Sequence, residues 1–133
     1  SLGKWRSSLD NQNFLLVDHH NPRFLTFGTE ESLHDLCLSN HLFLDGTFKS
    51  CPEPFTQLYS VHIQSSISNN TVPVLYSLLL NKTKNMYKLF FNELRSVAIN
   101  NDLVLNPGFI TLDFEQGAIG ALKQVFPATT LKD

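Results

Sequence analysis

Two short apolar runs that each end in an aspartate constrain the fold of this chain more than any other feature. Residues 41–45 read HLFLD, and residues 109–113 read FITLD. Such runs between polar breaks are typical of strands buried on both faces, because a half-exposed strand alternates apolar and polar residues. In open α/β sheets, chemistry collects at the carboxyl ends of such strands. Two adjacent parallel strands would therefore bring Asp45 and Asp113 together, as a pair of carboxylates suited to Mg²⁺ or Mn²⁺.

Each aspartate also has a purely structural interpretation. Asp45 and Gly46, with apolar residues on either side, form a strong signal for a tight hairpin turn. Asp113, followed three residues later by Gln116, matches a capping box that opens a helix. Taken singly, each aspartate fits its structural role at least as well as a metal site, and only the pairing favours the metal site.

The composition is that of one domain with a real core, since the chain has 133 residues and eleven phenylalanines. The formal charge of −2 and a pI near 6.2 argue against a strongly basic surface, so we expect most DNA contacts to lie outside this chain. Two cysteines and no signal-peptide pattern indicate an intracellular setting. No apolar run is long enough to span a bilayer, so no membrane partner is expected. The chain starts without Met and stops just after a strand begins, and we interpret it as a piece of a longer protein.

Residues 1–40 are expected to form an appendage ahead of the core. Residues 1–12 are polar and predict a weak helix or an ordered tail. Apolar pieces at 14–17 and 24–27 flank turn-forming residues, which predicts a hairpin. Thr29 is then the expected N-cap of a short amphipathic helix that ends near residue 39.

Residues 41–133 are expected to form an α/β core with a mixed sheet. Three antiparallel strands are predicted at 41–49, 56–65 and 72–80, followed by a long helix capped by Thr83, a strand at 109–113, a second helix and a strand near 128. The inward-facing residues of the second helix are expected to be Phe114, Ala118, Leu122 and Val125. Because crossovers between parallel strands are right-handed and need a helix, the fourth strand is placed beside the first.

Three segments in this order carry a resemblance to a known family: LDGTFKSCPEPFTQLYSVHI, VPVLYSLLLNKTKNMYKLFF and FITLDFEQGAIGALKQVFP. They closely resemble the transposase domain of Mutator-like elements, the MULE domain, over residues 41–133. Residues 13–40 are similar to the segment that precedes this domain, often downstream of a FLYWCH-type zinc finger, and no such finger occurs in these residues.

The resemblance implies an RNase H-like fold and a DDE/D-type polynucleotidyl transferase that cuts DNA and joins strands with two divalent metals, Mg²⁺ or Mn²⁺. It places the catalytic, metal-binding acids on Asp45 and Asp113. It further implies a nuclear location and DNA as the partner, and it is compatible with a homo-oligomer.

One feature of the family is missing from this chain. The third acid, a Glu or Asp, lies in a helix beyond Asp133, so we expect the chain alone to be an inactive part of a catalytic core. Glu115 does not easily replace it, because a residue two past Asp113 on a new helix points to a different side. We expect Glu115 to serve the first turn of its helix, with contact to metal-bound water as the alternative. Lys49 is near enough in sequence to approach phosphate, although a solvated lysine at a strand end is the favoured interpretation.

Other candidate sites are weaker. Cys37, His41 and Cys51 invite a zinc site, but their spacing lacks a second close ligand pair. His62 is expected to have a surface or hydrogen-bonded role. Three tyrosines are interpreted as core or rim aromatics: Tyr59, Tyr76 and Tyr87.

The sequence thus predicts the partial catalytic core of a Mutator-like DNA transposase, or of a host protein derived from one. The competing class is a non-catalytic, DNA-associated regulator, since some plant far-red-response transcription factors are similar to these transposases. The presence of both aspartates favours the enzyme ancestor. A third hypothesis is an unrelated α/β interaction domain in which Asp45 turns a hairpin and Asp113 caps a helix.

Overall fold

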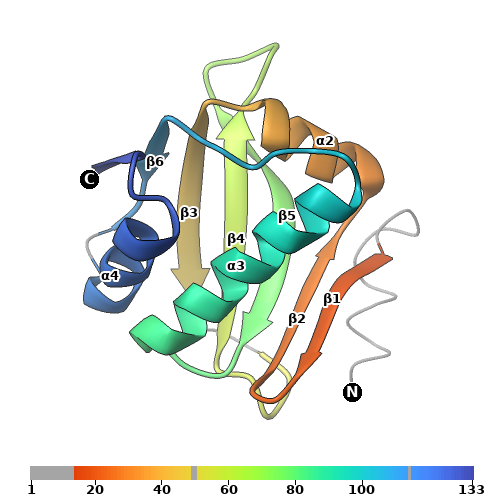
Figure 1. Cartoon of the computed structure of the whole chain (residues 1–133), viewed down its shortest axis with the longest axis vertical. Helices are drawn as coiled ribbons and strands as arrows, with labels where there is room; N and C mark the ends of the chain where they lie inside the picture. The colour runs from red at the N-terminus through yellow and green to blue at the C-terminus, as the bar shows by residue number, and fades with distance from the viewer. Residues whose placement is uncertain (1–13, 49–50, 114) are drawn as a thin grey trace.

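The computed structural model describes residues 14–48, 51–113 and 115–133. Within these residues the chain is an α/β protein with a seven-stranded mixed sheet and three helices (Figure 1). The elements in chain order are β1 Phe14–His20, β2 Arg23–Gly28, α2 Glu30–Leu38, β3 His41–Thr47, β4 Gln57–Gln64, β5 Thr71–Leu79, α3 Lys84–Asn100, β6 Phe109–Thr111, α4 Gln116–Val125 and β7 Thr130–Lys132. Three expectations fall outside the described residues: the helix or tail at 1–12, the placement of Lys49, and the inward position of Phe114.

The predicted N-terminal hairpin is confirmed, and it joins the main sheet. β1 and β2 pair antiparallel, and β2 pairs in turn with β5, where the side chains of Thr26 and Ser77 share a buried hydrogen bond of 2.8 Å. The helix α2 also begins as predicted, because Thr29 and Ser32 cap each other's backbone N–H. The strands before and after residue 40 therefore belong to one sheet. The boundary between an N-terminal appendage and a core at residue 40 stays a prediction.

The strands β3, β4 and β5 form the expected antiparallel meander. Asp45 and Gly46 lie inside β3, opposite Ser60 and Tyr59 of β4, so the hairpin-turn interpretation of Asp45 is wrong. Glycine occurs at position 46 because a side chain of β4 packs closely against it. A Cβ on Gly46 would lie 2.3 Å from Oε1 of the buried Gln57, so glycine here admits a neighbouring side chain and does not serve a left-handed turn.

The fourth strand lies where the crossover rule placed it. β6 pairs with β3 in parallel, in the register His41 to Phe109 and Phe43 to Thr111. β7 pairs in parallel with β6, which completes the sheet order β1-β2-β5-β4-β3-β6-β7. The prediction that two distant apolar segments are parallel neighbours is therefore confirmed.

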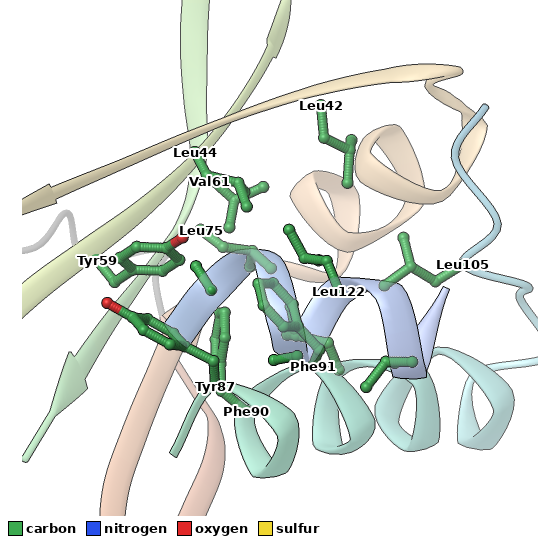
Figure 2. Close-up of a cluster of buried hydrophobic side chains, with 14 of the residues drawn as sticks. Leu42, Leu44, Tyr59, Val61, Leu75, Tyr87, Phe90, Phe91, Leu105 and Leu122 are labelled. Atoms are coloured by element: carbon green, nitrogen blue, oxygen red, sulfur yellow. The ribbon is translucent and has the colours of Figure 1, made fainter. Parts of the chain in front are cut away.

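The main core lies between the sheet and the helices. α3 crosses the face of β4 and β5 (Figure 1). Figure 2 shows Tyr87, Phe90 and Phe91 of α3 directed toward side chains of the central strands, among them Leu44, Tyr59 and Val61. Phe90 and Phe91 lie three and four residues after Tyr87, so a helix places all three side chains on the same face. Lys84 and Arg95 of the same helix are exposed.

Replacing Thr83 by Ala is expected to lower the free energy of unfolding by about 1 kcal/mol, because its side chain accepts the backbone N–H of Met86 at the start of α3. Urea unfolding followed by circular dichroism measures the change. Thr83→Ser keeps the hydroxyl and should stay close to the wild type, so an equal loss in both variants would contradict this account of the cap.

Candidate metal site

Asp45 and Asp113 occupy corresponding positions at the carboxyl ends of two neighbouring strands. The last pair of the parallel ladder joins Phe43 to Thr111, and each aspartate lies two residues further along its strand direction. Both aspartates are exposed. Both also line one pocket of about 150 Å³ at the end of the sheet, whose wall includes Leu44, Leu112 and Ala118. The strands thus deliver two carboxylates to one open pocket with an apolar wall.

Asp113 does not cap the helix that follows it. α4 begins at Gln116, and its N-cap residue is Glu115, whose side chain makes no capping hydrogen bond. A capping box would need Gln116 at the third helical position, whereas it is the first. The capping interpretation of Asp113 is therefore wrong. Together with the position of Asp45 inside β3, this removes both structural roles on which the unrelated interaction domain depended.

Glu115 differs from the expectation in two ways. It lines the same pocket as Asp45 and Asp113, whereas we expected it to point to a different side. Its backbone is still extended before the helix starts, which is why helix geometry did not set its direction. Its carboxylate oxygen Oε1 accepts a hydrogen bond of 2.6 Å from the hydroxyl of Tyr87, so it does not serve the first turn of α4.

Tyr59 and Tyr87 are buried close to the carboxylates of this pocket. From the sequence they were expected to be only core or rim aromatics. Tyr87 on α3 is fully buried, and burial together with its hydrogen bond to Glu115 raises its pKa. Tyr59 on β4 is 3% exposed and lines the pocket. Burial, aided by the nearby Tyr87, Glu115 and Asp45, raises the pKa of Tyr59 well above its usual value. No local pattern in the sequence marks either tyrosine, because the pairing of Tyr59 with Gly46 and the bond of Tyr87 to Glu115 join separate elements.

His62 has the hydrogen-bonded role that the sequence predicts. Its Nε2 lies 3.0 Å from the hydroxyl oxygen of Ser60, and Ser60 in turn donates to the backbone oxygen of Asp45 at 3.2 Å. Burial lowers the pKa of His62, while the charge of Asp45 acts in the opposite direction. This chain of contacts ties β4 to the segment of β3 that carries Asp45.

Neither a zinc site nor a site with three protein ligands forms within the described part of the chain. No group of three or more His, Cys, Asp or Glu side chains there is placed to hold a metal ion. His41 instead makes a 2.6 Å hydrogen bond with the Thr111 hydroxyl. The donor set at the pocket is all oxygen and contains two exposed carboxylates. It fits a hard divalent ion that keeps much of its water, as Mg²⁺ does.

Comparison with known families adds the decisive observation. The MULE transposase domain family matches residues 41–132, which is more than half of the chain. The chain belongs to the MULE transposase domain family. The matched part of the MULE domain runs from the first residue of β3 to the last residue of β7 and includes both aspartates. No curated protein matches the chain. As a transposase domain, the MULE domain implies an interaction with DNA.

Among the helices of the described residues, none is both long and apolar enough to cross a bilayer.

Proposed function

We propose that this MULE domain is the RNase H-like part of a DDE/D transposase, in which Asp45 and Asp113 are two of the metal-binding catalytic acids. The observation that carries the proposal is the parallel pairing of β3 with β6, which brings both aspartates to one pocket. The strand order β5-β4-β3-β6-β7, with three antiparallel strands followed by two parallel ones, supports the RNase H-like assignment.

In this proposal the carboxylate oxygens of Asp45 and Asp113 hold Mg²⁺ or Mn²⁺. A pair of such ions, when bound, stabilises the attacking and leaving oxygens of an in-line displacement at phosphorus. The protein supplies the charge and the geometry: the hydrogen-bonded ladder between β3 and β6 fixes the two backbones, and both side chains stay open to solvent, where a DNA strand has access. The third acid of the reaction and most DNA contacts come, on this proposal, from outside these residues, and the reaction takes place in the nucleus.

Mn²⁺ titration of the chain, with free Mn²⁺ followed by electron paramagnetic resonance, tests the metal site. We expect the wild type to bind Mn²⁺ and both Asp45→Asn and Asp113→Asn to bind it at least about tenfold more weakly, because each change removes the charge of one of two direct ligands. Glu31→Gln is the matched control, since it removes one exposed acidic charge on α2. Coinciding isotherms for the wild type and Asp45→Asn would overturn the proposal and favour a non-catalytic DNA-associated module.

A further inference from the structure

Tyr59 lines the pocket between the strands that carry the two aspartates, and its hydroxyl has no hydrogen-bond partner among the described residues. The side chain of Tyr59 is 3% exposed. No fully enclosed side-chain oxygen among those residues lacks a partner, so the Tyr59 oxygen must border open space. The pocket is the open space that this side chain lines. A largely buried phenol that lines a pocket of carboxylates offers that pocket a hydroxyl for a polar ligand.

Glu115, which lines the same pocket, is hydrogen-bonded to a buried side chain of α3. The hydroxyl of Tyr87 donates to Glu115 Oε1 at 2.6 Å and lies 3.3 Å from Oε1 of Gln57. Gln57 is fully buried and donates in turn to the backbone oxygen of Asn81. The single proton of the Tyr87 hydroxyl goes to the nearer acceptor, Glu115, and because Tyr87 is fully buried this bond holds Oε1 of the carboxylate toward α3. The second carboxylate oxygen of Glu115 is left for a ligand in the pocket.

The pocket has room for ordered water. Its volume of about 150 Å³ compares with roughly 10–15 Å³ for the centre of a single water molecule. The described residues offer no three-ligand group, so in this chain by itself an ion held by Asp45 and Asp113 would complete its shell largely with water. Water bound to a divalent ion donates strongly, and it needs fixed acceptors to be oriented.

We propose that Glu115 and Tyr59 bind the water molecules of a hydrated divalent cation held by Asp45 and Asp113, and that Tyr87 is the positioning residue of Glu115. This inference rests on the proposed function, and it adds three residues that act on the ion through water. Glu115 accepts a hydrogen bond from one water, and the Tyr59 hydroxyl engages another on the inner side. Tyr87 touches no water itself and acts only by orienting Glu115.

A double-mutant cycle in Mn²⁺ affinity tests the inference on the intact chain. We expect Glu115→Gln to weaken Mn²⁺ binding by about 10–100-fold, the usual effect of removing such an outer partner, and Tyr87→Phe to weaken it in the same direction. The Tyr87→Phe, Glu115→Gln double variant should bind no more weakly than Glu115→Gln alone, because Tyr87 acts through Glu115. Tyr76→Phe on β5 is the matched control and should leave the affinity unchanged.

Water-proton relaxation of the bound Mn²⁺ provides a second measurement that a merely structural role would not move. Tyr59→Phe and Glu115→Gln should each change the relaxation rate, because each removes a partner that orders metal-bound water, while Tyr76→Phe should not. Unfolding of each variant without metal shows whether it is folded, and Glu115→Gln has nearly the same shape as the wild-type side chain.

The outcomes separate the inference from the proposed function. If Asp45→Asn abolishes binding while Glu115→Gln and Tyr87→Phe bind as the wild type does, the inference is wrong and the proposed metal site stands. Additive losses in the double variant would remove the positioning role of Tyr87. If the wild type shows no binding that depends on Asp45, the proposed function fails, and the inference with it.

Discussion

Replacing Phe90 by Ala is expected to lower the free energy of unfolding by about 3–5 kcal/mol, the usual cost of emptying a buried phenylalanine site. Phe90 is fully buried on α3 and meets rings from three directions. Its ring centroid lies 6.5 Å from that of Phe24, 5.8 Å from that of Tyr59 and 4.9 Å from that of Phe91. Because these partners come from β2, β4 and α3 itself, the cavity would open where the N-terminal hairpin, the meander and the helix meet.

Urea unfolding measures this change, and the same helix offers a matched control. Ile99 is 64% exposed near the end of α3, so Ile99→Ala should stay within about 0.5 kcal/mol of the wild type. A similar loss in both variants would show that the effect comes from the helix itself and not from the packing of Phe90.

Two glycines on α4 are expected to respond to alanine in opposite ways. A Cβ on Gly117 would lie 2.4 Å from the backbone oxygen of Lys82, which cannot move without shifting the segment ahead of α3, so Gly117→Ala should cost about 1–3 kcal/mol. A Cβ on Gly120 would lie 3.2 Å from the flexible side chain of Lys84. Gly120→Ala should therefore be neutral or stabilising by up to about 1 kcal/mol, because alanine favours helix over glycine.

The comparison of these two variants needs only their urea midpoints, since each changes the same residue type in the same helix. Helix propensity alone predicts that both variants gain stability, and contact with the neighbouring backbone predicts that only Gly120→Ala does. A gain for Gly117→Ala would contradict the close approach of α4 to the segment before α3.

Periodicity and chain connectivity were enough to predict most of the fold. The alternation in β4 and the helical spacing of Tyr87, Phe90 and Phe91 depend on residues near in sequence, so they can be recognised without the structure. The parallel pairing of β3 with β6 followed from the handedness of crossovers, which leaves few places for a fourth strand. The observed strand β6 ends at Thr111, two residues before the predicted end, because its parallel ladder stops there.

The details of the site depend on contacts that no local pattern encodes. Tyr87 and Glu115 are 28 residues apart, and only the packing of α3 against α4 brings them together. Local signals were also misleading at the aspartates. Asp45-Gly46 has the composition of a turn, but its pairing with Ser60 and Tyr59 of β4 keeps it extended. The N-terminal hairpin was identified correctly, but its partner β5 lies some 50 residues away and could not be inferred from turn chemistry.

The attachment of β2 to β5 also affects how much polypeptide this MULE domain needs to fold. Phe24, Leu33 and Leu36 contribute to the main core, although all three precede the residues that match the family. Removing residues 1–40 would remove these side chains from the core and would make β5 an edge strand with unpaired backbone amides. Unpaired edge strands favour self-association. We therefore expect the length that folds to exceed the length that matches the family model.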